Sequence, residues 1–159
     1  MKVLLVCMGN ICRSPSAEGV LRHYLALSGL AKRVFIDSAG TYGYHVGAPP
    51  DARAQKAAIR RGIDISRLRA RPVEPEDFER FDMILAMDRD NLEDLRRLCP
   101  PHHQEKIELF MRYSGRERDA DVPDPYYGGP DGFERVLDMI EDAARGLADE
   151  LRRRIRDEG

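Results

Sequence analysis

The sequence predicts an α/β fold in which a single open four-stranded parallel sheet carries helices on both faces. Short apolar runs alternate along the chain with segments of helical periodicity. The runs are continuous in their apolar character, which is typical of parallel strands that are buried on both faces. The last segment keeps helical spacing of its apolar residues over about six turns. Because 159 residues suit one core and no repeat or linker interrupts the alternation, we expect residues 1–159 to form a single domain.

The first half of the chain is expected to supply two strands and two helices. Residues 2–6 form the first apolar run, and the helix that follows ends at Gly29, a residue that commonly stops helices. Residues 34–36 are expected to form the second strand. Asp51 is a suitable cap for a helix that ends near Gly62.

The second half repeats this pattern. Residues 83–87 form a third apolar run, and the helix that follows carries leucines at positions 92, 95 and 98 and ends at Pro100. Residues 107–110 are expected to form the fourth strand. The last helix is expected over residues 133–155, where apolar residues keep one face.

Composition limits the classes of function. The formal net charge is -2, so nothing favours a nucleic acid or a membrane surface as a partner. The apolar opening is too short for a signal-peptide core or a membrane span, and we therefore expect a cytoplasmic protein. An odd number of cysteines, three, argues against a disulfide scaffold and leaves room for a working thiol.

The loop from Cys7 to Ser14 is the first candidate for a binding site, because ligands in open α/β sheets bind beyond the carboxyl ends of strands. Gly9 and Asn10 are residue types that tolerate positive φ, so the loop can curl with its N–H groups pointing inward. Ser14 is a good N-cap type, and Pro15 suits the first helical position after it. Inward N–H groups and the positive end of a helix dipole would together form a cradle for an anion.

Two side chains of this loop indicate its chemistry. Cys7 stands at the start of the cradle, where the thiolate is the stabilised form of a cysteine. Arg13 has a planar fork that can hold two oxygens of a tetrahedral anion. Together they predict nucleophilic phosphoryl transfer. The leaving group then needs a proton, and the residues alone leave three candidates in one Pro-containing loop: Asp119, Asp121 and Asp124.

At this point the sequence resembles a known family, the low-molecular-weight protein tyrosine phosphatases. Residues 6–14, Val-Cys-Met-Gly-Asn-Ile-Cys-Arg-Ser, and residues 124–128, Asp-Pro-Tyr-Tyr-Gly, are similar to two motifs of that family. Residues 37–41 and 87–88 are similar as well, so the resemblance extends over essentially the whole chain. The larger protein tyrosine phosphatases share the separation of cysteine and arginine, but they have a histidine where Val6 stands here.

The resemblance implies a metal-free and cofactor-free phosphatase with a catalytic set of Cys7, Arg13 and Asp124. Cys7 would attack phosphorus, Arg13 would hold the phosphate oxygens, and Asp124 would protonate the leaving phenolic oxygen. The carboxylate of Asp124 would then activate the water that hydrolyses the phosphocysteine. The partners implied are a phosphotyrosine-containing protein or peptide as substrate and phosphate as product.

The resemblance also implies the residues that bind substrate. Tyr126 and Tyr127 would wall the cleft, with Tyr44 on the opposite wall. The remaining binding residues come from the loop: Met8, Gly9, Asn10, Ile11, Cys12 and Ser14.

A polar network is expected to hold the loop. The Ser14 hydroxyl would donate to the sulfur of Cys7 as well as cap the helix. By resemblance, Ser38 would join Asn10 and Ser14, and some relatives complete the network with a histidine near the position of Leu68. Since leucine can neither donate nor accept a hydrogen bond, we expect the network here to be shorter or to close differently.

Several alternatives stay open. Members that hydrolyse phosphoarginine carry a threonine where this chain has Ile11. An arsenate reductase of this fold would need further cysteines in a mobile segment, and Cys99 at a helix end is a poor candidate. A non-catalytic anion-binding module has no need for a thiol, and the sequence has no nucleotide-binding fingerprint. Cys12 is either a packed residue or the partner of Cys7 in a reversible disulfide.

Overall fold

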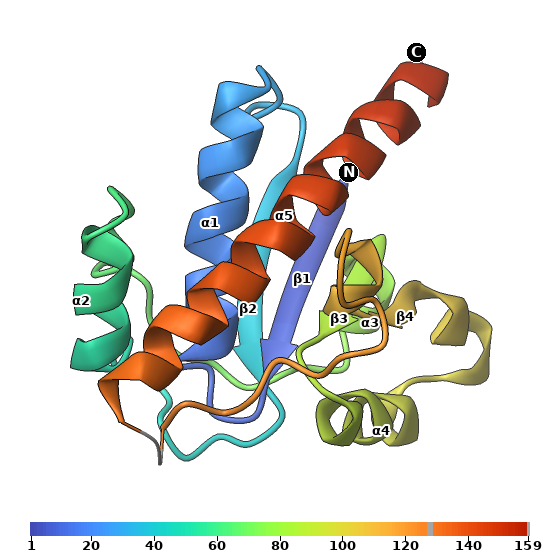
Figure 1. Ribbon diagram of the computed structural model, residues 1–159. Coiled ribbons are helices and arrows are strands. Elements are labelled where there is room, and N and C mark those ends of the chain that lie inside the picture. The colour runs from blue at the N-terminus through green and yellow to red at the C-terminus, as the bar shows by residue number, and fades with distance from the viewer. Residues whose placement is uncertain (127–128, 159) are drawn as a thin grey trace.

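A parallel four-stranded sheet forms the centre of the computed structural model, which describes residues 1–126 and 129–158 (Figure 1). The strand order is β2-β1-β3-β4. The strands are β1 (Lys2–Cys7), β2 (Phe35–Gly40), β3 (Met83–Ala86) and β4 (Ile107–Leu109). All three pairings are parallel, which confirms the predicted sheet. Strand β2 is longer than expected, because its register with β1 continues to the pair Cys7–Gly40.

Helices cover both faces of the sheet, as predicted (Figure 1). Side chains on successive positions of β1 point to opposite faces. Val3 and Leu5 pack in a core with helices α1, α2 and α5, whereas Leu4 and Val6 pack in a second core with α3 and α4. The helices are α1 (Arg13–Leu27), α2 (Ala52–Ile59), α3 (Asp77–Arg80), α4 (Arg89–Leu98) and α5 (Pro130–Glu158), and two 3-10 helices are η1 (Pro101–Lys106) and η2 (Phe110–Tyr113).

The start of α1 differs from the prediction. Its N-cap is Cys12, without a side-chain cap, and the first helical residue is Arg13. The prediction that Ser14 caps the helix is wrong, because its hydroxyl bonds to Cys7 and Asn10. Pro15 is the third residue of α1 and lies within its first turn, where the N–H groups have no intrahelical acceptor and a proline costs no hydrogen bond.

The predicted helix ends are confirmed in α1 and α2. Gly29 has a φ of 74°, and the N–H of Leu30 donates to the carbonyl of Leu25 at 2.8 Å, which closes the last turn of α1. The carboxylate of Asp51 accepts the N–H of Arg53 and so caps α2. Helix α5 is longer than the pattern indicated, with 29 residues.

The order of the strands places a crevice at the carboxyl end of β1. The chain crosses from β1 to β2 on one side and later to β3 on the other side. In open α/β sheets this reversal is where ligands bind. None of the helices among the described residues is both long and apolar enough to cross a membrane.

Candidate active site

A cavity of about 320 Å³ opens at the carboxyl end of β1. It brings together nine of the residues expected from the sequence and one that the sequence did not indicate, His45. The lining consists of Cys7, Met8, Gly9, Ile11, Cys12, Arg13, Tyr44, His45, Asp124 and Tyr126. Asn10 and Ser14 are buried in the body of the loop, and Tyr127 lies outside the described residues.

The backbone of the loop curls as expected. Asn10 has a φ of 58°, the left-handed conformation that asparagine tolerates. A Cβ atom on Gly40 would lie 2.8 Å from the carbonyl oxygen of Met8, so only glycine lets the end of β2 approach the loop this closely. In the described part of the chain, the N–H groups of residues 8, 9 and 11–14 have no hydrogen-bond acceptor. These unpaired donors fit a tetrahedral anion.

Cys7 lies at the base of this loop with 2% of its surface exposed. Its Sγ atom is 3.1 Å from the Oγ atom of Ser14 and accepts the N–H of Asn10 at 3.3 Å. Both neighbours can donate a hydrogen bond to the sulfur.

The orientation of Asn10 determines the direction of the hydrogen bonds at Cys7. The N–H of Arg71, which can only donate, bonds to Oδ1 of Asn10 at 3.0 Å. The Nδ2 atom of Asn10 therefore donates to the hydroxyls of Ser14 at 2.8 Å and Ser38 at 3.1 Å. Since Ser14 accepts from Asn10, its own hydrogen is available for the sulfur of Cys7.

A buried carboxylate closes the polar network. The hydroxyl of Ser38 donates to Oε1 of Glu18 at 2.7 Å, and Oε2 of Glu18 accepts two bonds from Arg22. Burial raises the pKa of Glu18 above its ordinary value, against the lowering effect of these partners. Glu18 thus ends this chain of hydrogen bonds, whereas the side chain of Leu68 cannot take part in it. The sequence analysis missed this role, although the i,i+4 spacing of Glu18 and Arg22 was a signal for their ion pair.

Arg13 is buried, with 3% of its surface exposed, and is held by acceptors on two sides. Its Nη1 atom lies 2.5 Å from the carboxylate of Asp88 and donates to the carbonyl of Val122 at 3.0 Å. Burial lowers the pKa of Arg13, but the charges of Cys7 and Asp88 outweigh it, so the net shift is upward. The guanidinium is therefore a fixed positive charge beside the sulfur.

The three candidate acids are separated by their positions. Asp124 lines the cavity, and its Oδ2 atom is 3.7 Å from Nη2 of Arg13. Asp121 instead pairs with Arg89, and the same arginine binds the carbonyl of Asp119, so neither carboxylate lines the cavity. Of the three candidates, Asp124 is therefore the one whose side chain lines the cavity.

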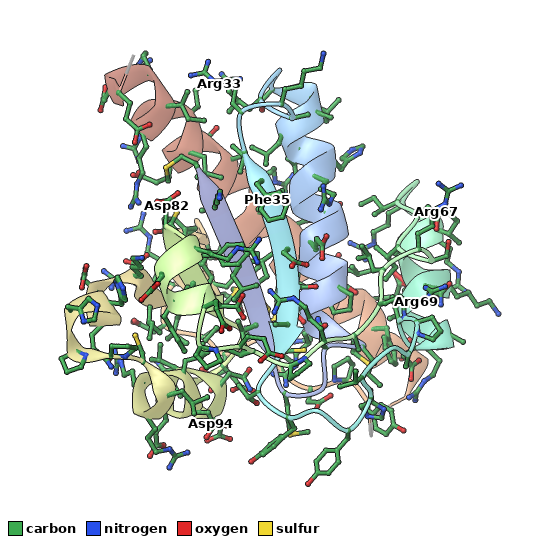
Figure 2. The ribbon with its side chains drawn as sticks, turned by 180° about the vertical axis from the view of Figure 1, so that it is seen from behind. Arg33, Phe35, Arg67, Arg69, Asp82 and Asp94 are labelled. Atoms are coloured by element: carbon green, nitrogen blue, oxygen red, sulfur yellow. The ribbon has the colours of Figure 1, made fainter. Side chains whose placement is uncertain are left out.

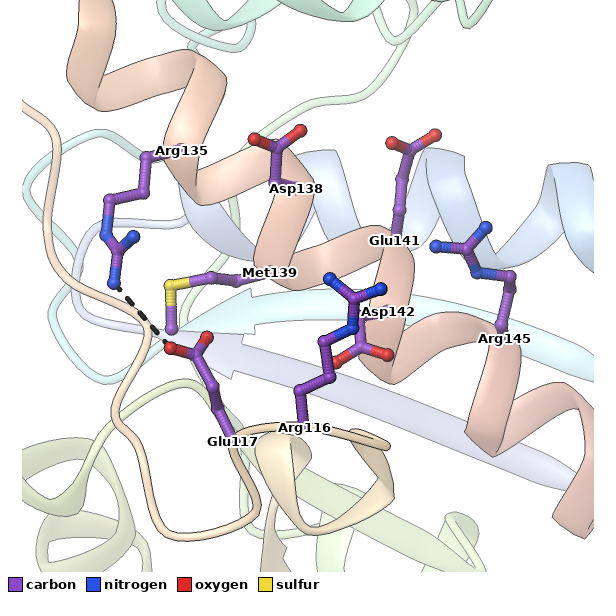
Figure 3. Close-up of a pocket in the computed structure, with 8 residues that line it drawn as sticks. All are labelled: Arg116, Glu117, Arg135, Asp138, Met139, Glu141, Asp142 and Arg145. Atoms are coloured by element: carbon purple, nitrogen blue, oxygen red, sulfur yellow. Dashed lines mark ion pairs between the residues drawn. The ribbon is translucent and has the colours of Figure 1, made fainter.

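The loop that carries Asp124 is anchored to α5 at its other end. Ser114 donates a hydrogen bond to the carboxylate of Asp142. Glu117 pairs with Arg135 of α5 at 3.7 Å, across a groove of mixed charge (Figure 3). These contacts fix the start of the segment that leads to the cavity.

The rim of the cavity is aromatic, as expected. Tyr44 exposes 84% of its surface, and its ring centre lies 5.7 Å from that of Tyr42. Tyr126 also lines the cavity, and the guanidinium of Arg53 lies 5.2 Å from its ring centre. His45 packs on the loop itself, because a Cβ atom on Gly9 would lie 3.1 Å from its ring.

The other two cysteines differ from Cys7 in their surroundings. Burial and the negative charge of Asp51 raise the pKa of Cys12, so it is a thiol at neutral pH. Cys99 packs in the core on the opposite face of the sheet. Among the described residues, no cluster of three or more histidine, cysteine or acidic side chains could hold a metal ion.

The fold and this cavity define a class of protein: an α/β protein with a thiol and a fixed guanidinium at a loop of unpaired N–H groups. Within that class, a family model described as low molecular weight phosphotyrosine protein phosphatase matches residues 2–157, and the chain belongs to this family.

Individual relatives agree with the family model. The low molecular weight protein-tyrosine-phosphatase of Streptomyces coelicolor is 41% identical over 157 residues, which cover 97% of this chain and 95% of that protein. A crystal structure of a protein tyrosine phosphatase from Entamoeba histolytica, with Hepes in the active site, matches with a TM-score of 0.93 and 42% identity over 96% of this chain and 97% of that one. The YwlE arginine phosphatase has the same fold at 27% identity, with a TM-score of 0.86 over 96% of each chain.

Proposed function

We propose that this protein is a phosphotyrosine-protein phosphatase that works through a phosphocysteine intermediate, with Cys7, Arg13 and Asp124 as its catalytic residues. Membership of the family supports the reaction class. The observation that carries the assignment of residues is the position of the Cys7 sulfur below a loop of unpaired N–H groups and beside the guanidinium of Arg13. We further propose that residues 1–159 act as one catalytic domain.

The first chemical step transfers the phosphoryl group to sulfur. The thiolate of Cys7 attacks phosphorus, and the bond between phosphorus and the phenolic oxygen breaks with its electron pair on oxygen. Asp124 gives its proton to that oxygen, and tyrosine leaves. Arg13 and the loop N–H groups bind the oxygens on which negative charge develops.

The second step returns the enzyme to its starting state. The carboxylate of Asp124 takes a proton from water as the water oxygen attacks phosphorus. The bond between sulfur and phosphorus breaks with its electron pair on sulfur, and phosphate leaves. The hydroxyl of Ser14, which is 3.1 Å from the sulfur, stabilises the thiolate that departs.

The lining of the cavity favours an aromatic leaving group. Ile11 presents an apolar side chain, and Tyr44 and Tyr126 offer faces for a substrate ring. Tyr127, which lies outside the described residues, is proposed for the same wall. A protein or peptide with phosphotyrosine fits this lining better than phosphoarginine does. Cys99 is remote from the cavity, which disfavours an arsenate reductase that passes a disulfide outward.

A panel of substrates tests the proposal. Metal-free enzyme would be assayed with an aryl phosphate, a phosphotyrosine peptide, phosphoarginine, and arsenate with a thiol reductant. We expect turnover of the first two and its loss in Cys7→Ser, while Cys99→Ser, a buried cysteine away from the cavity, stays active. Turnover confined to phosphoarginine or to arsenate would replace the proposal with the corresponding alternative. Because three unpaired cysteines suit a reducing compartment, we also propose a cytoplasmic location.

A further inference from the structure

A second cleft of about 380 Å³ adjoins the catalytic cavity. The two share Met8, Arg13 and Asp124 as a common wall. The second cleft continues over the first turns of α4, and Asp94 of this helix lies at the end of the molecule where the strands terminate (Figure 2). A substrate whose phosphate sits on the loop would therefore have its neighbouring residues close to this second cleft.

The second cleft carries an excess of negative charge. Its lining includes four carboxylates besides the proposed proton donor Asp124, against the two guanidinium groups of Arg13 and Arg97. The acidic residues are Asp88, Asp90, Glu93, Asp94 and Asp124. This is the opposite charge to that of the loop that binds the phosphate, so the two neighbouring clefts select for groups of opposite sign.

The acidic residues differ in how far they are already paired. Asp88 pairs with Arg13, and Asp94 pairs with Arg97. Glu93 is 3.8 Å from the same Arg97, and Asp90 has no ion-pair partner among the described residues. The dipole of α4 favours an acidic residue in the first turn of the helix, which explains Asp90. It does not explain Glu93, which lies in the second turn.

A buried acceptor in the same cleft lacks a donor. Asn91 lines the cleft with 2% of its surface exposed, and its Oδ1 atom is buried without a hydrogen-bond partner in the described part of the chain. Such an acceptor costs free energy until a donor reaches it. A guanidinium or ammonium group supplies a donor for Asn91 and a positive charge that offsets the excess of acidic side chains.

We infer that the acidic cleft binds an arginine or lysine side chain close to the phosphotyrosine in the substrate, and this inference rests on the proposed phosphatase function. Neighbouring residues of a peptide are 3.8 Å apart at their Cα atoms, and a basic side chain carries its charge on a long flexible stem. A basic residue near the phosphotyrosine can thus enter the second cleft while the phosphate occupies the first. The enzyme is then selective for phosphotyrosine in a basic sequence context.

Peptide pairs provide the test. Phosphotyrosine peptides with Arg, Ala or Glu at each position within two residues of the phosphotyrosine would be compared by kcat/KM. For the favoured position we expect the Arg peptide to exceed the Glu peptide by roughly tenfold at low ionic strength, since one exposed ion pair accounts for about two- to fivefold. The ratio should shrink as salt is added.

The double variant Asp90→Asn with Glu93→Gln removes two charges of the cleft without touching the catalytic residues. It should reduce the ratio to about twofold and leave turnover of a small aryl phosphate unchanged. Asp149→Asn removes an exposed carboxylate from α5, away from the cleft, and should keep the ratio of the wild type.

The outcomes separate this inference from the proposed function. Turnover of all phosphotyrosine peptides without a preference for basic neighbours would overturn the inference and leave the function standing. A preference that persists in the double variant would likewise overturn it, because the basic residue would then bind elsewhere. Absence of turnover for every aryl phosphate would refute the function itself.

Discussion

Replacing Ser14 by alanine tests how the loop stabilises the sulfur of Cys7. The Ser14 hydroxyl is fully buried and lies 3.1 Å from Sγ of Cys7. It accepts a hydrogen bond from Nδ2 of Asn10 at 2.8 Å. A hydrogen bond to a charged group contributes about 1.5–3 kcal/mol. Loss of that bond should lower kcat by about 10- to 150-fold, because 1.4 kcal/mol corresponds to about a factor of ten. The effect should fall mainly on the second step, in which the thiolate leaves phosphorus.

Pre-steady-state kinetics with an aryl phosphate measure this effect. We expect Ser14→Ala to release close to one equivalent of phenol in a rapid burst and then to turn over slowly, because the phosphoenzyme accumulates. Ser16→Ala is the matched control, since Ser16 is also buried and, within residues 1–126 and 129–158, its hydroxyl bonds only to the carbonyl of Cys12. A Ser14→Ala enzyme that keeps kcat within twofold of Ser16→Ala would refute the role given to this hydroxyl.

Three further predictions concern the acid, the guanidinium and a helix cap. Asp124→Ala should lower kcat/KM for phosphotyrosine peptides by about 10²–10⁴-fold, and by less for aryl phosphates with good leaving groups. The control Asp121→Ala should stay near wild type. Equal losses for good and poor leaving groups would contradict a role of Asp124 as acid. Arg13→Lys should cost at least about tenfold in kcat/KM because an ammonium cannot hold two oxygens as a planar fork does, and an unchanged kcat/KM would argue against bidentate binding. Asp51→Ala should lower the free energy of unfolding by about 1 kcal/mol at neutral pH. Since a hydrogen bond from Arg53 lowers the pKa of Asp51, this contribution is present above the unfolded-state pKa and lost as the pH falls through the folded-state value. Chemical denaturation at several pH values measures this contribution to the free energy of unfolding. The control Asp51→Asn should keep most of it at neutral pH. A difference between wild type and Asp51→Ala that stayed constant into acid would contradict the expected pH dependence.

The sequence predicted the strands and the longer helices because their patterns are local. Residues 3–6 are apolar throughout, and the glycine at position 29 and the aspartate at position 51 are terminators that act on their own helices. Helix α3 and the two 3-10 helices were missed, since segments of four to six residues are determined by tertiary packing more than by periodicity.

The site was predictable where its residues are adjacent in sequence and unpredictable where they are not. The loop from Cys7 to Ser14 contains the proposed nucleophile, the unpaired N–H groups and the guanidinium in one stretch. Ser14 was misassigned as a cap because a serine before a proline has the same local pattern in both roles. Only the fold brings Glu18 to Ser38, and only the fold shows that Asp124, among three aspartates, reaches the cavity.

Trapping the phosphorylated enzyme is the most direct test of Cys7 as the nucleophile. The wild-type protein and the Ser14→Ala variant would be mixed with an aryl phosphate, quenched in acid within milliseconds and digested for mass spectrometry. We expect one phosphoryl group on Cys7, present in larger amount in the variant. Phosphate attached to any other residue, or a burst of phenol with no modified peptide that contains Cys7, would contradict it.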